Sequence, residues 1–136
     1  MDTTELVAAL LTAYNVHDAA AAAALYAPDG SHRDVAMGAD QPDPEKIAGG
    51  LARLFAAFPE ARWSCRSVLA DGDQAAVPYS LEGRLQGRLG PYEPAGQPIR
   101  LSGVLLVEAA DGTIRRTTDY WDSGTLHRQL TALPQA

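Results

Sequence analysis

Apolar side chains recur at helical spacing in three stretches of the N-terminal half of the chain. The second stretch consists mostly of alanine and stops at Pro28-Asp29-Gly30, a sequence that favours a turn. The third stretch begins with Pro44, a residue suited to the first turn of a helix, and is followed by Pro59. The pattern therefore predicts three helices, over residues 3–15, 18–27 and 44–58.

After Pro59 the period changes to the alternation of apolar and polar side chains that is typical of β-strands. Asp71-Gly72 and Asp111-Gly112 favour tight turns between antiparallel strands. Pro78 lies inside one predicted strand and has no N–H to donate, so we expect that strand to be bulged or at an edge there. Strands are predicted over residues 31–37, 62–70, 74–85, 98–109 and 113–122, with a loop over 38–44.

Helices followed by an antiparallel meander predict one α+β domain that covers residues 1–136. We expect the three N-terminal helices to pack against a strongly curved, mostly antiparallel sheet that encloses a pocket. One face of strand 98–109 is apolar and is expected to point inward, with Ile99, Leu101, Leu105 and Val107. A short amphipathic segment at the C-terminal end is expected to close the sheet, with Leu126, Leu130 and Leu133.

The predicted strand 113–122 departs from this pattern because neither of its faces is apolar. One face carries Arg115, Thr117, Asp119 and Trp121, and the other carries Ile114, Arg116, Thr118, Tyr120 and Asp122. Departures from local rules are most common where function requires particular side chains. This strand is therefore the first place to look for a reactive group.

Composition and charge narrow the classes of partner. The chain has 46% hydrophobic residues, which is typical of a globular protein, and a net charge of −6, which argues against nucleic acid as a partner. Cys65 is the single cysteine, so an internal disulfide is excluded. No stretch is apolar and long enough to cross a membrane, and the first residues lack a basic leader, so we expect a cytoplasmic protein. Three histidines without short ligand spacing predict no metal site.

Five segments, in this order and spacing, carry a resemblance to a known family. They are Asn15-Val16-His17-Asp18, Leu25-Tyr26-Ala27-Pro28-Asp29-Gly30, Phe55-Ala56-Ala57-Phe58-Pro59-Glu60, Asp111-Gly112-Thr113-Ile114 and Thr118-Asp119-Tyr120-Trp121-Asp122 with Leu126 and Gln129-Leu130 after it. Together they resemble the SnoaL-like polyketide cyclases of the NTF2-like superfamily over nearly the whole chain. The resemblance implies a cone-shaped fold, a homodimer, and no metal or organic cofactor.

The resemblance also implies acid–base chemistry on a small, largely apolar, polyketide-like or terpenoid-like substrate. Asp119 matches the carboxylate that serves as general acid and base in the cyclases. A buried carboxyl has a raised pKa, which helps it to take and return a proton near neutral pH. Leu105 stands where the cyclases have a partner histidine, so the helper must be a different residue.

Candidate helpers are side chains that stabilise an enolate: His32 and Arg100 first, with Tyr14 and Tyr79 as further possibilities. The expected walls of the substrate pocket are Tyr14, Phe58, Trp63, Tyr79, Leu105 and Trp121. His32 shares one strand face with Asp34. The two side chains can point inward, but the favoured expectation is a hydrogen-bonded polar pair at the margin of the sheet.

Two other functions stay open at this point. Epoxide-opening relatives also use an aspartate in an Arg-Asp-Tyr run, which Asp119 fits although Thr118 replaces the arginine; that chemistry requires a second acid. A non-catalytic ligand-binding or dimerisation module is the third reading, in which Asp119 is an exposed residue or pairs with Arg84, Arg115 or Arg116. An enclosed pocket with a carboxylate near its floor would favour catalysis, whereas a cavity filled by side chains would favour a scaffold role.

Overall fold

An aspartate begins each helix. The computed structural model describes residues 1–132, and in this part each of four helices has an N-cap aspartate whose carboxylate accepts a backbone N–H of the first turn. Asp2 also forms a capping box with Glu5. The helices are α1 (Thr3–Asn15), α2 (Ala19–Ala23), α3 (Pro44–Ala57) and α4 (Ser123–Leu130).

The strands form one curled sheet in the order β2-β1-β7-β6-β5-β3, and β4 also pairs with β5. The pairing of β1 with β7 is parallel and all others are antiparallel, so the sheet is mixed, mostly antiparallel. Its strands are β1 (Tyr26–Asp34), β2 (Ala39–Gln41), β3 (Arg62–Ser64), β4 (Leu69–Asp71), β5 (Gln74–Arg84), β6 (Pro98–Ala110) and β7 (Thr113–Trp121).

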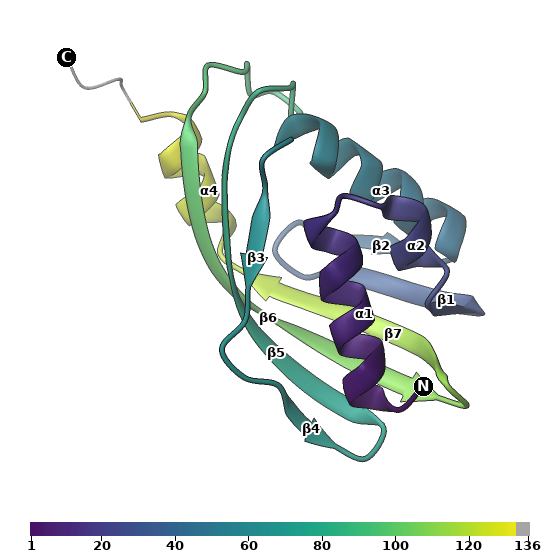
Figure 1. Cartoon of the computed structure of the whole chain (residues 1–136). Helices are drawn as coiled ribbons and strands as arrows, with labels where there is room; N and C mark the ends of the chain where they lie inside the picture. The colour runs from purple at the N-terminus through teal and green to yellow at the C-terminus, as the bar shows by residue number, and fades with distance from the viewer. Residues whose placement is uncertain (133–136) are drawn as a thin grey trace.

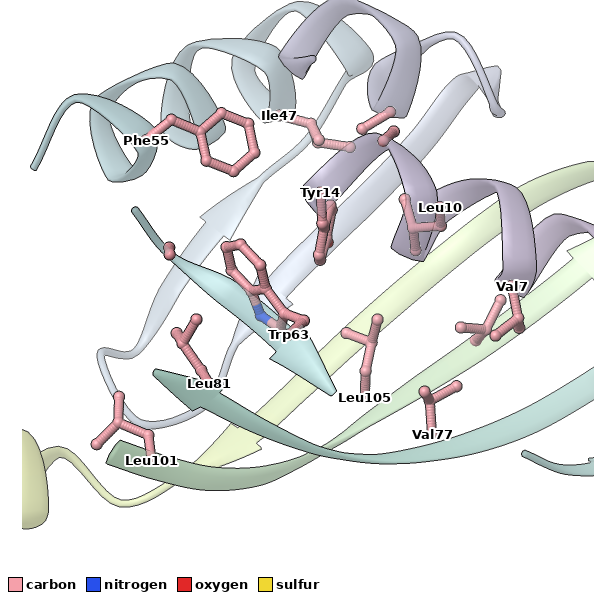
Figure 2. Close-up of a cluster of buried hydrophobic side chains, with 14 of the residues drawn as sticks. Val7, Leu10, Tyr14, Ile47, Phe55, Trp63, Val77, Leu81, Leu101 and Leu105 are labelled. Atoms are coloured by element: carbon pink, nitrogen blue, oxygen red, sulfur yellow. The ribbon is translucent and has the colours of Figure 1, made fainter. Parts of the chain in front are cut away.

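The long strands β5, β6 and β7 bend around α1, which lies across the concave face of the sheet (Figure 1). α2 and α3 pack beside α1 on the same side, and α4 lies at the other end of the sheet against β6. Figure 2 shows Val77 and Leu81 of β5 and Leu101 and Leu105 of β6 pointing toward the helices. The apolar face predicted for β6 is therefore confirmed as the inner face.

A β-bulge explains why the alternation fails in β7. Glu108 pairs with Arg116, but its neighbour Ala109 pairs with Ile114, so Arg115 is an extra residue in β7. Because of this extra residue, Ile114 faces inward before the bulge and Thr117 faces inward after it, although they would lie on opposite faces in a regular alternation. Both side chains are fully buried. Beyond the bulge, the inward positions are Thr117, Asp119 and Trp121, the set that carries the polar groups.

The structure corrects the prediction for residues 18–37. The helix ends at Ala23 instead of Ala27, and the strand expected from residue 31 begins at Tyr26. Tyr26 pairs with Ile114 of β7, and Ile114 donates a backbone hydrogen bond to Leu25. Pairing with an existing strand outweighs the helical preference of a short alanine run. Ala39–Gln41, predicted as loop, forms the edge strand β2.

The strand predicted over residues 62–70 is broken into β3 and β4, and Pro78 lies opposite the break. β4 pairs with β5 as far as Ala76, and β3 pairs with β5 from Ser80 onward. Since proline has no N–H to donate, β5 has no partner on this side at Pro78, as the edge prediction requires. Both predicted Asp-Gly turns are present, with Gly72 and Gly112 at positive φ. Leu133 lies outside the described residues.

Candidate active site

The concave face of the sheet, α1, α3 and the segment 88–92 surround a cavity of about 630 Å³. Its walls are mainly apolar, formed by side chains that include Ile47, Leu51, Leu54, Phe58, Trp63, Leu81, Leu89 and Leu101. A group of polar side chains faces the same space: Tyr14, His32, Asp34, Tyr79 and Asp119, with the indole of Trp121. The volume and mixed lining are typical of a small-molecule site.

Asp119 lies in this cavity, where the β7 bulge directs it. Burial raises the pKa of its carboxyl to about 6, although the hydrogen bond from Tyr79 lowers this pKa and the charge of Asp34 raises it further. The Tyr79 hydroxyl donates to Asp119 Oδ1 at 2.7 Å. Asp119 forms no ion pair with Arg84, Arg115 or Arg116; Arg115 instead lies 3.6 Å from Asp29. The carboxyl can therefore exchange protons near neutral pH.

Gly103 makes room for the Tyr79 side chain. It pairs with Tyr79 across β5 and β6, and a Cβ at this position would lie 2.4 Å from the Tyr79 hydroxyl and 2.7 Å from the Tyr120 carbonyl. Any larger residue would displace the Tyr79 ring, since such distances are below van der Waals contact. The glycine in the middle of an otherwise regular strand thus permits the hydrogen bond to Asp119.

Asp34 is the second carboxylate of the cavity. It pairs with Asp119 across the parallel strands β1 and β7, so the two lie on neighbouring strands at the same level. Trp121 Nε1 donates to Asp34 Oδ1 at 2.9 Å, and the Met37 backbone N–H donates to the same oxygen at 3.1 Å. These two N–H donors fix the position of the Asp34 carboxyl at the wall of the cavity.

The Tyr14 hydroxyl faces the cavity and has no hydrogen-bond partner among the described residues. Tyr14 lines the cavity, and its ring packs against Trp63 with 5.1 Å between ring centroids. In residues 1–132 every fully buried side-chain oxygen has a hydrogen-bond partner, so the Tyr14 hydroxyl is not fully buried. The hydroxyl therefore opens onto the cavity. Burial raises the pKa of Tyr14 well above its usual value, so the phenol keeps its hydrogen and serves as a donor.

Two of the site residues predicted from the sequence, Arg100 and Leu105, do not line the cavity. Arg100 is on the outer face of β6, where its Nε donates to Glu82 Oε1 at 2.8 Å, so it is not near Asp119 in this structure. The alternation of β6 requires this, since its neighbours Ile99 and Leu101 point inward. Leu105 pairs with Asp119 and points inward, but it packs in the core below the cavity. The other expected wall residues, Tyr14, Phe58, Trp63, Tyr79 and Trp121, line the cavity.

His32 and Asp34 are not a mutual pair at the sheet margin. Each faces the cavity and has its own partner: His32 Nδ1 lies 2.7 Å from Thr117 Oγ1, and Asp34 is held by Trp121. Asp122 lies outside the cavity and is the N-cap of α4, where it accepts a hydrogen bond from the Gly124 N–H at 2.9 Å.

Sequence reasoning missed several residues that shape the site. Tyr26 and Thr117 form a buried hydrogen bond behind His32, and Gly103 sets the position of Tyr79. Gly103 had a signal, because an isolated glycine in a strand marks a close approach. No sequence signal indicated the contact between Thr117 and Tyr26, because this contact depends on the pairing of β1 with β7.

Two other features of the described residues bear on the site. No helix in residues 1–132 is both long enough and apolar enough to span a bilayer. In the same residues, no group of three or more histidine, cysteine, aspartate or glutamate side chains is placed to hold a metal ion.

Solved structures share this architecture over almost the full chain. A protein from Catenulispora acidiphila with a ketosteroid isomerase-like fold, in complex with trimethylamine, is 25% identical, with 97% of this chain and 95% of that chain covered and a TM-score of 0.83. A candidate polyketide cyclase from Pseudomonas putida is 26% identical, with coverages of 96% and 99% and a TM-score of 0.81. AclR, a candidate hydroxylase from Streptomyces galilaeus, is 20% identical, with coverages of 98% and 83% and a TM-score of 0.84.

The comparisons confirm the fold predicted from the sequence, the NTF2-like or ketosteroid isomerase-like cone. No curated protein matches the chain. Residues 4–130 match the family described as SnoaL-like polyketide cyclase, which is nearly all of the described structure. The chain therefore belongs to the SnoaL-like polyketide cyclase family.

Proposed function

We propose that the protein is a cofactor-independent enzyme that moves a proton on a small, largely apolar, polyketide-like or terpenoid-like molecule, with Asp119 as acid and base. The observation that carries this proposal is the Asp119 carboxyl inside an apolar-walled cavity, with its pKa raised to about 6. At that pKa both protonation states are populated near neutral pH, which general acid–base catalysis requires. The family membership supports cyclase or isomerase chemistry.

The geometry supports a two-step reaction through an enolate. The Asp119 carboxylate takes a proton from the carbon next to a substrate carbonyl. The electron pair of that C–H bond forms a C=C bond, and the π electron pair of the carbonyl moves onto its oxygen. Tyr14 donates a hydrogen bond to this oxygen as it becomes negative, since its hydroxyl is free toward the cavity. Asp119 then returns the proton to a different carbon, which isomerises the substrate. Alternatively, the enolate carbon attacks a second carbonyl and closes a ring, and Asp119 gives its proton to the alkoxide oxygen that forms.

Asp119→Asn tests this role. It keeps the shape of the side chain and its contact with Tyr79 but cannot accept the proton, so turnover of a polyketide-like or enone substrate should fall by about 10²-fold or more. Asp111→Asn is the matched control, because it makes the same chemical change at an exposed turn where asparagine tolerates the positive φ. Full activity of Asp119→Asn in a folded protein would contradict the proposal.

Asp34 favours a second candidate, epoxide opening, which needs two acids in the cavity. The raised pKa of Asp119 suits it to protonate the epoxide oxygen, while Asp34, held by two N–H donors, suits the activation of water. Asp34→Asn separates the two chemistries. Epoxide opening should be lost in this variant, whereas enolisation uses only Asp119 of the two carboxylates and should persist.

The non-catalytic alternative makes a different prediction. A ligand-binding module with this cavity would bind apolar ligands with an affinity that Asp119→Asn leaves unchanged, and no candidate substrate would turn over. The uncommitted hydroxyl of Tyr14 fits a bound ligand in either case. The raised pKa of Asp119 favours catalysis, because perturbed titratable groups in a cavity are typical of active sites.

We also propose that two chains form a homodimer through the outer face of β6 and β7. On this face Val104 pairs with Tyr120, and Leu106 pairs with Thr118. Tyr120 and Leu106 are large apolar side chains that are 46% and 39% exposed in one chain. Light scattering should give twice the mass of one chain for the wild type and the mass of one chain for Leu106→Glu.

A further inference from the structure

Three hydrogen-bonded side chains connect the interior of the protein with the cavity: Tyr26, Thr117 and His32. The Tyr26 hydroxyl lies 2.6 Å from Thr117 Oγ1, and His32 Nδ1 lies 2.7 Å from the same oxygen. Thr117 is fully buried and Tyr26 is 5% exposed. Their hydrogens must therefore be satisfied inside the protein.

The direction of each hydrogen bond follows from the hydrogens that are available. Burial raises the pKa of Tyr26, so its phenol keeps its hydrogen. Thr117 Oγ1 is the one acceptor that the described residues offer to this hydrogen, so Tyr26 donates to Thr117. The hydrogen of Thr117 is then directed to His32 Nδ1. A neutral imidazole that accepts at Nδ1 carries its own hydrogen on Nε2.

Nε2 of His32 opens onto the cavity. His32 is a lining residue, and Nε2 has no hydrogen-bond partner among residues 1–132. In these residues every fully buried side-chain nitrogen or oxygen has a hydrogen-bond partner. Nε2 has none, so it is not fully buried and is accessible from the cavity. Burial lowers the pKa of His32, against an opposing effect of the Asp34 charge, and so favours the neutral ring.

We propose that Tyr26 and Thr117 are positioning residues that hold His32 as the Nε2–H tautomer, which then donates a hydrogen bond to the substrate oxygen in the cavity. This inference rests on the proposed function above and names a second donor beside Tyr14. The imidazole keeps its hydrogen throughout, because Asp119 performs the proton transfers. A neutral N–H donor stabilises a developing oxyanion without leaving a buried positive charge beside the apolar walls.

The tautomer can be measured directly, without a substrate, by NMR correlation of ring nitrogens with ring hydrogens in ¹⁵N-labelled protein. The His32 signals are assigned as those missing from His32→Asn. We expect wild-type His32 to show a protonated Nε2 and an unprotonated Nδ1. Thr117→Val removes the hydroxyl and keeps the shape, so both tautomers should become populated. Thr117→Ser should restore the single tautomer, because it restores the hydroxyl.

Thr118→Val is the matched control, since Thr118 is the adjacent residue on β7 and also buried, but its side chain lies on the opposite face of the sheet. It should leave the His32 signals unchanged. Tyr26→Phe is a second test that does not alter Thr117: without the Tyr26 donor, Thr117 can accept from Nδ1–H, so the tautomers should again mix.

The proposal is overturned if wild-type His32 carries its hydrogen on Nδ1, or if folded Thr117→Val and Tyr26→Phe both retain the single Nε2–H tautomer. These outcomes are separate from the fate of the proposed function. Suppose that the wild type shows the Nε2–H tautomer, that Thr117→Val and Tyr26→Phe lose this preference, and that Asp119→Asn keeps full activity. This result would refute the acid–base role of Asp119 and leave the tautomer assignment intact.

Discussion

Tyr79→Phe isolates the effect of one hydrogen bond on the Asp119 carboxyl. The change removes the hydroxyl that donates to Asp119 Oδ1 at 2.7 Å and leaves the aromatic ring in the wall of the cavity. Burial and the charge of Asp34, both of which raise the Asp119 pKa, stay in place. The Tyr79 hydrogen bond is the main effect that lowers this pKa, so the pKa must rise when it is lost.

The size of the rise follows from the strength of the bond. A hydrogen bond to a charged group contributes roughly 1.5–3 kcal/mol, and about 1.4 kcal/mol corresponds to one pKa unit. Tyr79→Phe should therefore raise the Asp119 pKa by about one to two units, from about 6 to between about 7 and 8. Water that enters beside Asp119 would replace part of the lost bond and reduce the rise toward the lower figure.

The assay is a ¹³C NMR titration of the aspartate side-chain carboxyls, with the Asp119 signal identified as the one missing from Asp119→Asn. If a substrate is in hand, the rising limb of the pH–rate profile should move to higher pH by the same amount, since the reaction needs the carboxylate. An Asp119 pKa that stays at its wild-type value or falls in Tyr79→Phe would refute the reasoning.

Three other variants test the site. Tyr14→Phe should leave the free energy of unfolding within about 0.5 kcal/mol of the wild type in urea titrations, because the hydroxyl has no partner in the described residues, yet lower turnover by about 10²-fold. Gly103→Ala should cost about 1–3 kcal/mol of stability and raise the Asp119 pKa in the same NMR titration, since its Cβ would displace the Tyr79 hydroxyl; an unshifted pKa would contradict this. Because the Asp119 pKa is raised from 3.8 to about 6, its stabilising contribution is complete below pH 3.8 and is lost as pH rises through about 6. Asp119→Asn should therefore gain about 2.5 kcal/mol in unfolding free energy relative to the wild type between pH 4 and pH 8, and parallel pH dependences in urea would rule this out.

Expectations about single elements depended on interactions within a few residues, and most of them agree with the structure. The capping box at Asp2 and Glu5, Pro44 at the start of α3 and the Asp-Gly turns are local features that need no partner elsewhere. The alternation of apolar and polar residues in β6 reflects burial of one face of the strand, and it allowed the inner face to be predicted from the sequence. Local preference failed where a distant strand competed for the same residues, as at Tyr26, which joins β7 instead of continuing α2.

Prediction of the site was less complete. Asp119 was identified through the family resemblance, and the structure places it in the cavity. Arg100 was proposed as a helper although the alternation of its own strand directs it to the outer face. Leu105 faces inward as expected but belongs to the core below the cavity.

The amino-acid sequence by itself determined the type of most main elements and the inner face of β6, and the family resemblance of its segments pointed to Asp119 as the candidate carboxylate. Only the tertiary structure decided which side chains meet that carboxylate. The bulge at Arg115 directs Thr117 and Asp119 inward, and the parallel pairing of β1 with β7 brings His32, 85 residues earlier in the chain, against Thr117. Register between distant strands depends on packing of the whole sheet, whereas caps, turns and alternation depend on near neighbours in the chain.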